Sequence, residues 1–366
     1  MFLKKEEKKY NRLVPILRKP QSSIISYLHP DFIKALPYIS HIKKSLYSVL
    51  GDYFQSSDLR LAFTFQAKYL GMSPLTCPGF YSIIPYIEHK QGIFHVMGGL
   101  NKISEAMAKS IKEDNGKINL GKSVKRLIIK NKKVEGVVLE NGERRFADKV
   151  IINADFSYAM ENLFPKGFLK KYSPQKLKKK KYSCSAYLLY LGINRKINLP
   201  HHTICFGDNY KKFLHDIENH KLTDEIAMYI QNATVTDKSL APKGKTALYV
   251  LVPTTNNRAK IDWKKQNEFK EKIFSKLEKV TKINNLRKHI EFEKTITPDE
   301  WESDYNVFIG AIFNLAHNFD QMLYLRPHNK FEEVENCYLV GGGTHPGSGL
   351  PTIYQSGIIT ADLINK

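Results

Sequence analysis

Apolar residues recur at helical spacing in the first sixty residues. Two sets show this spacing: Leu13, Ile16 and Leu17, and Leu36, Ile39, Ile42 and Leu46. Residues 1–60 are therefore predicted to be mostly helical. The stretch is also basic and amphipathic, which suits either a helix that lies on a membrane or an ordinary helix that packs on a core.

The pattern changes to alternation after a further helix. Gly98-Gly99 predicts a tight turn, and Leu100, Ile103, Met107 and Ile111 then give a helix its apolar face. Strands are predicted over 118–120, 124–129, 134–139 and 150–155. Asn141-Gly142 predicts a hairpin turn, because both residues accept positive φ.

Residues 156–330 have a third pattern. Apolar strand candidates are separated by long stretches, at 184–192, 227–231 and 246–252. A helix is predicted near 263–281. Together these segments favour an antiparallel sheet with a helix.

The tail reads as a strand, a glycine-rich turn and a helix. Tyr338–Val340 is a short apolar run, and the glycines at 341–343 follow it. Pro351 suits the first turn of a helix, where its missing N–H costs nothing. The stripe of small residues at 357, 360 and 361 would let this helix lie close to a sheet. Free amides beside a helix N-terminus form a site for an anion such as a pyrophosphate, whereas an isolated Gly-Gly-Gly is more often a plain loop.

Several segments together resemble bacterial phytoene desaturases, which belong to the FAD-dependent carotenoid and retinoid oxidoreductases. The tail Gly-Gly-Gly-Thr-His-Pro-Gly-Ser-Gly-Leu-Pro at 341–351 is similar to their C-terminal signature, and Ser356-Gly357 continues it. The segment ending in Tyr-Leu-Gly-Met-Ser-Pro at 69–74 also matches. Further matches lie at 84–92, 97–100, 201–210, 241–242 and 251–253, so the resemblance covers nearly the whole chain.

The resemblance implies FAD as the cofactor and names its contacts. Gly342, Gly343 and Thr344 would lie along the FAD pyrophosphate, and the backbone of Val124 would face the adenine. His345, Pro346 and Pro351 match the motif without a chemical role. Without the resemblance, Val124 is simply a strand valine.

The implied fold class is mixed α/β. It combines a two-part, Rossmann-like FAD-binding domain, incomplete at its N-terminal side, with a substrate domain built from an antiparallel sheet and helices. Residues 1–84 and 156–330 are predicted to form the substrate- and membrane-facing domain. Residues 85–155 and 331–366 are predicted to form the FAD-binding domain.

The implied function is FAD-dependent desaturation of a long apolar polyene, of the phytoene or diapophytoene type, in carotenoid biosynthesis. Hydride transfer to flavin needs no strong base, and neither G-x-S-x-G nor HExxH occurs. Glu88 and Arg60 lie in matched segments and are the candidate catalytic residues, although either suits a structural salt bridge. A related carotenoid isomerase or oxygenase remains an alternative.

No G-x-G-x-x-G turn, the unit that holds the ADP part of FAD, occurs in the sequence. The chain therefore looks like a family member without its first FAD-binding unit. An inactive fragment, or half of a split enzyme with an N-terminal FAD-binding partner polypeptide, remains open.

The charge indicates an anionic partner. Lys and Arg total 57 against 36 Asp and Glu, a net charge of +21. With an insoluble substrate, an anionic membrane surface is expected rather than nucleic acid, although lysines spread along the chain also simply solvate a surface. The predicted location is cytoplasmic, peripheral on the inner face of the membrane. A non-enzymatic basic protein that binds nucleic acid or membrane is the competing hypothesis.

Other signals exclude several kinds of site. The four cysteines have no CxxC spacing, which fits a reducing compartment without disulfides. Adjacent residues on a strand would point to opposite faces, so His201-His202 are not expected to form a metal site. The N-terminus lacks the apolar core of a signal peptide, and no run approaches about 18 apolar residues.

Overall fold

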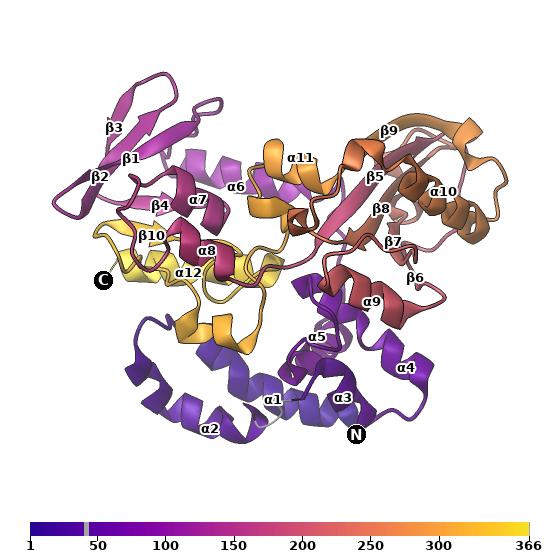
Figure 1. Cartoon of the computed structure of the whole chain (residues 1–366), viewed down its shortest axis with the longest axis horizontal. Coiled ribbons are helices and arrows are strands. Elements are labelled where there is room, and N and C mark those ends of the chain that lie inside the picture. Colours follow the sequence, from indigo (N-terminus) through magenta and orange to yellow (C-terminus); the bar gives the residue numbers. More distant parts are fainter. Residues whose placement is uncertain (40–43, 366) are drawn as a thin grey trace. The chain divides into compact units, whose positions relative to one another are not determined.

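The computed structural model describes residues 1–39 and 44–365, so Ile42 of the predicted N-terminal pattern lies outside the described residues. The chain forms two compact units (Figure 1). Unit 1 comprises residues 1–92, 121–183 and 306–366, and unit 2 comprises 93–120 and 184–305. These units are structural, and the functional division into two domains stays a prediction.

Unit 1 begins with helices that confirm the helical prediction for residues 1–60: α1 (Phe2–Leu17), α2 (Pro30–Ile39), α3 (Leu46–Gly51) and the start of α4 (Ser57–Ala62). Helix α5 (Ile83–Gln91) lies beyond that prediction. A 3₁₀ turn, η1 (Ile24–Leu28), joins α1 to α2. Leu13 and Ile16 of α1 pack against Phe32 and Ala35 of α2, which confirms the helical spacing of the first set. Helical prediction succeeds for α1 and α2 because each buries one apolar stripe, whereas α4 has no buried residue.

A three-stranded antiparallel sheet follows in unit 1, made of β1 (Val124–Lys130), β2 (Lys133–Leu139) and β3 (Arg144–Phe146) in that order. Asn131 and Lys132 both have positive φ and close the first hairpin, a turn that the sequence pattern missed. The predicted turn at Asn141-Gly142 joins β2 to β3, with positive φ at Gly142.

The second part of unit 1 is a parallel pair of strands, β4 (Val150–Ile152) and β10 (Cys337–Leu339), with α7 (Phe156–Asn162), α8 (Pro174–Lys179) and α12 (Leu350–Ile364). The buried core here joins β4, β10 and α7. The other edge of β10 is also paired, because Leu339 N–H donates to Asn329 O (2.8 Å) and Phe331 N–H donates to Cys337 O (2.9 Å). The chain itself therefore covers an edge that would otherwise expose unpaired backbone groups.

Unit 2 contains the predicted antiparallel sheet and helix. Its five strands lie in the order β6 (His202–Cys205), β7 (Met228–Gln231), β8 (Thr246–Thr254), β5 (Ser185–Ile193) and β9 (Ile290–Ile296). Helix α10 (Asn267–Thr281) packs its Phe269, Ile273 and Leu277 on this sheet (Figure 1). The remaining helices are α6 (Asn101–Glu113), α9 (Tyr210–Glu218) and α11 (Pro298–Ser303). The mixed α/β class is confirmed, although strands β6 and β9 escaped prediction.

One predicted strand is wrong. Residues 118–120 form no strand, and Leu120 is 87% exposed. The helix before them is present as α6, and both Gly98 and Gly99 have positive φ in the turn that starts it. A short apolar run becomes a strand only where a neighbouring strand takes its backbone hydrogen bonds, and residues 118–120 have no such neighbour in the described chain.

Candidate functional site

The glycine-rich turn joins β10 to α12, as the tail pattern predicts. Gly341 leaves the strand with φ +101°, a conformation that favours glycine, and its N–H donates to Ser356 Oγ (3.2 Å). Thr344 is buried, and its hydroxyl donates to Pro327 O (2.5 Å). These bonds attach the turn to α12 on one side and to the 326–329 segment on the other.

Arg326 lies fully buried beneath this turn and holds it through backbone carbonyls. Its guanidinium donates from Nη2 to Gly342 O (2.6 Å) and from Nε to Thr344 O (3.0 Å). It also donates to Gln321 O (3.3 Å) and Leu315 O (3.2 Å). Burial lowers the pKa of Arg326 to about 10, so the group stays cationic at neutral pH. A buried positive charge under the turn favours an anion above it.

Gly342 and Gly343 have different surroundings. Neither N–H finds an acceptor in the part of the chain that the structure describes. Gly342 is half-buried, whereas Gly343 is enclosed: a Cβ there would lie 2.4 Å from Phe156 Cβ and 2.7 Å from Asn314 Oδ1. Gly342 is therefore the more accessible of the two amides.

Helix α12 presents an uncapped N-terminus directly after the turn. Its N-cap residue is Gly349, which has no side chain to accept from the first-turn amides, and Leu350 is 44% exposed. The positive end of the helix dipole is thus available to a negative group.

Polar residues bind α12 to β10. Thr360 donates to Leu339 O (3.0 Å), and the buried Asn329 amide donates to Ser356 Oγ (3.1 Å) and His345 O (3.1 Å). The predicted stripe of small residues is therefore only partly right. Thr360 faces the strand, but nothing lies within 4 Å of a Cβ placed on Gly357.

Two titratable groups near the turn have shifted pKa values. His345 is buried, and burial lowers its pKa to about 4; its ring faces the carbonyls of Leu17 and Lys19 without a well-formed hydrogen bond. The enclosed carboxyl group of Asp155 accepts from Tyr158 N (3.0 Å) and Asn314 Nδ2 (2.6 Å). Desolvation raises the pKa of Asp155 to about 6.

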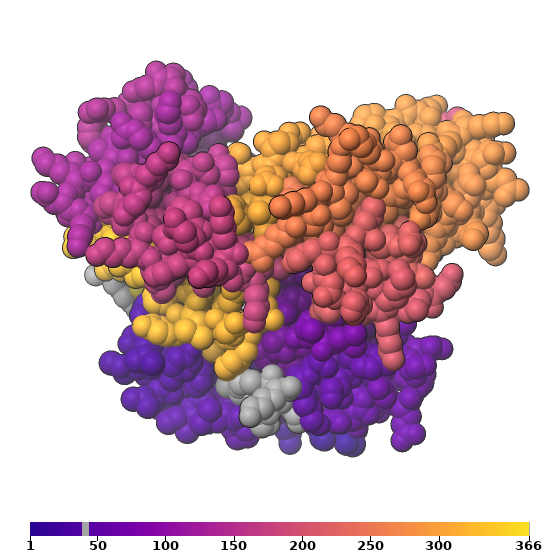
Figure 2. Space-filling model, viewed as in Figure 1, coloured from indigo at the N-terminus to yellow at the C-terminus, as the bar shows by residue number. Residues whose placement is uncertain are grey.

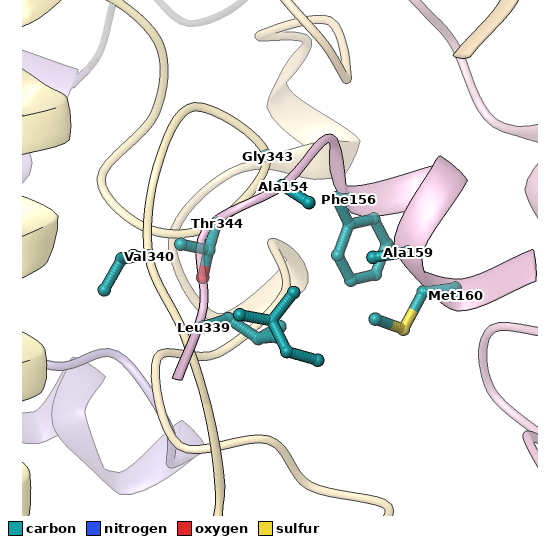
Figure 3. Close-up of a pocket in the computed structure, with 9 residues that line it drawn as sticks. Ala154, Phe156, Ala159, Met160, Leu339, Val340, Gly343 and Thr344 are labelled. Atoms are coloured by element: carbon teal, nitrogen blue, oxygen red, sulfur yellow. The ribbon is translucent and has the colours of Figure 1, made fainter. Parts of the chain in front are cut away.

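A small cavity lies between α7 and the end of β10 (Figure 3). Figure 3 shows Phe156, Ala159 and Met160 on the α7 side and Leu339 and Thr344 on the strand side. Its volume of about 10 Å³ holds at most one water. A flavin ring does not fit there.

The other predicted cofactor contact, Val124, opens β1 opposite Leu139, and its side chain is 40% exposed. The structure thus leaves Val124 accessible without bringing it into contact with the turn. Its role remains a prediction.

The two catalytic candidates lie on different helices of unit 1. Glu88 on α5 accepts from Gln66 Nε2 (2.8 Å). Arg60 on α4 donates to Phe54 O (3.1 Å), and its guanidinium lies 5.0 Å from the centre of the Tyr47 ring. Glu88 thus contacts an amide, and Arg60 contacts a carbonyl and an aromatic ring, rather than the expected ion-pair partners. A catalytic role for either residue stays a prediction.

Sequence reasoning overlooked the polar residues that support the turn. Arg326, Asn314 and Asp155 carried no predicted role. A signal was available for Arg326, because an arginine amid the apolar and proline residues of Leu323–Pro327 needs a buried partner.

Unit 2 holds a histidine-rich cluster. The rings of His201 and His202 stack at 4.4 Å, and His95 lies 5.1 Å from His201. Within residues 1–39 and 44–365, no three potential ligands are placed to hold a metal ion.

The residues around the turn fit the diphosphate of FAD. The free amide of Gly342, the uncapped start of α12 and the buried Arg326 charge are three independent features that favour an anion at one place.

Known proteins similar to this chain include flavin-dependent enzymes. Residues 40–365 match the family model described as flavin containing amine oxidoreductase. The chain is 50% identical to a 4,4'-diapophytoene desaturase (4,4'-diapolycopene-forming) from Methylomonas sp, over 100% of the chain and 72% of that protein. It is 37% identical to an all-trans-zeta-carotene desaturase from Myxococcus xanthus, over 88% of the chain and 62% of the relative.

A solved structure shares the fold. A crystal structure of an oxidoreductase from Methanosarcina mazei superposes with a TM-score of 0.62 at 19% identity, covering 91% of this chain and 71% of that one. The chain thus spans between about three fifths and three quarters of the length of the proteins it matches.

Proposed function

The chain belongs to the flavin-containing amine oxidoreductase family, and we propose that it serves the FAD-dependent desaturation of a long apolar polyene in carotenoid biosynthesis. The observation that carries this proposal is the 50% identity, over the whole chain, to a 4,4'-diapophytoene desaturase. That relative favours a diapophytoene-type substrate over the longer phytoene type. The glycine-rich turn, with its anion-binding features, supports the same function.

Desaturation removes two hydrogens from adjacent carbons, one as hydride and one as a proton. Bound FAD would supply the hydride acceptor. The residues of this chain would bind and orient it: Gly342 N–H and the start of α12 would hold the diphosphate, and Arg326 would keep the carbonyls of the turn directed inward. The carbonyl of Gly342 and the N–H of Gly343 belong to one planar peptide unit, so they point in opposite directions. Because Arg326 holds the Gly342 carbonyl inward, the Gly343 N–H points away from Arg326.

Three site assignments belong to this proposal. Gly343 and Thr344 would shape the turn along the cofactor, and Val124 would lie near the adenine. Glu88 and Arg60 are the proposed catalytic residues, of which Glu88 is the proton-accepting candidate because it is a half-buried carboxylate. A related carotenoid isomerase or oxygenase would use the same cofactor contacts, and an inactive fragment would keep the fold without turnover.

Membrane association is part of the proposal, because the substrate is insoluble in water. No helix within residues 1–39 and 44–365 is long and apolar enough to cross a membrane. We place the chain peripherally on the cytoplasmic, anionic face of a membrane, and the net charge of +21 supports this location.

The test is pigment conversion in cells that make 4,4'-diapophytoene. The chain is expressed with and without a polypeptide that supplies a strand, G-x-G-x-x-G turn and helix, and the extracted pigments are separated by chromatography. We expect yellow to red products only with both polypeptides, and none when the chain carries Gly342→Val. Absence of any conversion although the complex contains FAD would refute the desaturase proposal, and a product with only altered double-bond geometry would identify an isomerase.

A further inference from the structure

Five large aliphatic side chains in the N-terminal part of unit 1 are turned to solvent. They are the N-terminal apolar surface: Ile24 (66% exposed), Ile25 (70%), Leu28 (72%), Ile33 (54%) and Leu36 (55%). The first three belong to η1 and the last two to α2, which are consecutive and in contact. Figure 2 shows atoms of this indigo N-terminal segment at the surface of unit 1.

This surface is separate from the face by which α2 joins the core. Phe32 is 8% exposed and Ala35 is fully buried, and both pack against α1. Tyr27 of η1 meets Phe32 edge-on, with ring centres 4.5 Å apart, which fixes the turn on the helix. Packing on a core therefore accounts for one face of α2 and leaves Ile33 and Leu36 unexplained.

Cationic residues flank and interrupt this segment in the sequence. Arg18, Lys19 and Lys34 are exposed, and Lys34 follows Ile33 directly on α2. The single carboxylate of this segment, Asp31, already pairs with Lys19 Nζ (2.8 Å). Single exposed apolar residues are ordinary, but five in one short segment with a cationic border indicate a binding surface.

We propose that the N-terminal apolar surface docks the chain on an anionic lipid bilayer. In this arrangement η1 and α2 lie flat, the five aliphatic side chains enter the boundary between head groups and acyl chains, and Arg18 and Lys34 meet lipid phosphates. A second copy of the chain fits less well, because it would bring the same positive charges together. The idea that docking delivers a water-insoluble polyene to the chain rests on the proposed function. The evidence for the binding surface itself is the exposure of the five aliphatic side chains and the nearby positive charge.

Flotation of the full chain with lipid vesicles tests the proposal without flavin or substrate. We expect the chain to float with vesicles that contain phosphatidylglycerol and more weakly with pure phosphatidylcholine, and raised salt should weaken flotation only with the anionic vesicles. Ile25→Ser together with Leu28→Ser should weaken partitioning at least about tenfold, because two aliphatic side chains no longer enter the bilayer. Lys34→Glu should weaken binding to the anionic vesicles alone.

Leu120→Ser is the matched control, since Leu120 is as exposed as any of the five residues and lies in unit 2. It should float like the unchanged chain, and circular dichroism should be the same for all variants. The proposal is overturned if the unchanged chain fails to float, if the Ile25/Leu28 variant floats normally, or if the Leu120 variant loses as much. It is also overturned if the double variant changes only the oligomeric state. Pigment conversion is scored separately, so failure of desaturation leaves this result standing.

Discussion

Gly342 and Gly343 are adjacent, but the space around a side chain differs between the two positions. An Ala methyl at 343 would collide with Phe156 and Asn314, so we expect Gly343→Ala to lower the free energy of unfolding by about 1–3 kcal/mol without any cofactor. At 342 the nearest atom, Ser348 Oγ at 3.0 Å, is a hydroxyl that donates to Phe313 O. Gly342→Ala should therefore cost less than Gly343→Ala, because the contact is less close, which makes Gly342→Val a cleaner probe of flavin binding than Gly343→Val.

Urea unfolding of the flavin-free chain checks this ranking. Gly357→Ala serves as the control, because it adds a methyl group in open space within α12 and should stabilise the chain by about 0.5–1 kcal/mol. If Gly343→Ala unfolds at the same urea concentration as the unchanged chain, the tight contact with Phe156 is wrong.

Asp155 gives a pH dependence whose sign is set by its raised pKa. The folded state keeps this proton up to about pH 6, whereas the unfolded carboxyl loses it near 3.8. Its contribution is therefore fully present below 3.8 and is lost as the pH rises through 6, amounting to at most about 3 kcal/mol. The lowered pKa of His345 acts oppositely, because stability then rises with pH above 4.

The difference between two stability profiles isolates the Asp155 contribution from that of His345. Asp155→Asn keeps an acceptor for Tyr158 N and removes the titration. Relative to the unchanged chain, its stability should improve progressively from pH 4 to pH 6, as measured by urea unfolding at a series of pH values. Profiles that run parallel over this interval would show that Asp155 does not titrate there.

At the scale of elements, one buried carboxylate connects the 93–120 segment to the rest of unit 2. Asp237 accepts from Gly98 N (2.6 Å) and His95 Nε2 (3.2 Å), and Ser239 donates to its other oxygen from N (3.0 Å) and Oγ (2.6 Å). Gly98 begins the turn that leads into α6, a helix with no buried residue of its own. The position of α6 therefore depends on this anchor more than on packing.

Asp237→Ala should release α6 while the five-stranded sheet stays folded. We expect trypsin to cleave after Lys102 and Lys109 several times faster than in the unchanged chain, since local opening of the segment costs less free energy. Mass spectrometry of the early fragments identifies the sites. Asp216→Ala removes only a surface pair with Lys212 and is the control. Equal cleavage rates in all three proteins would place the anchor of α6 elsewhere.

At the scale of the whole molecule, the prediction concerns the affinity of the chain for FAD. The turn and α12 can contact the diphosphate from one side, but no G-x-G-x-x-G turn is present to contact it from the other. Each charge-assisted hydrogen bond is worth about 1.5–3 kcal/mol, so the loss of two or three weakens binding by orders of magnitude. We predict that the chain purified alone is colourless and turns yellow when co-expressed with a polypeptide that carries that unit.

The visible absorbance of the purified protein measures how much flavin the chain holds, alone and with the partner polypeptide. Stoichiometric FAD in the chain alone would mean that other residues hold the cofactor. Residues 329–331 pair with the second edge of β10, so this edge offers no unpaired backbone to another chain. We expect exposed apolar residues such as Leu120 and Phe94 to lower the solubility of the purified chain.

The sequence by itself determined the elements and the family, because both are written in local patterns. Helical spacing predicted the N-terminal helices, alternation predicted β1 and β2, and the tail motif predicted the turn before α12. Local patterns also failed locally: residues 118–120 alternate like a strand but have no strand beside them. Whether these residues form a strand depends on a neighbouring strand, which the spacing of apolar residues does not reveal.

Only the tertiary structure decided what surrounds the turn. Arg326 reaches Gly342 and Thr344 across 16 and 18 residues, and Gly343 meets Phe156 and Asn314 from far earlier in the chain. The second edge of β10 and the outward face of α2 were settled in the same way. Burial and hydrogen bonding of these groups depend on which distant segments pack together, and no periodicity in the sequence carries that information.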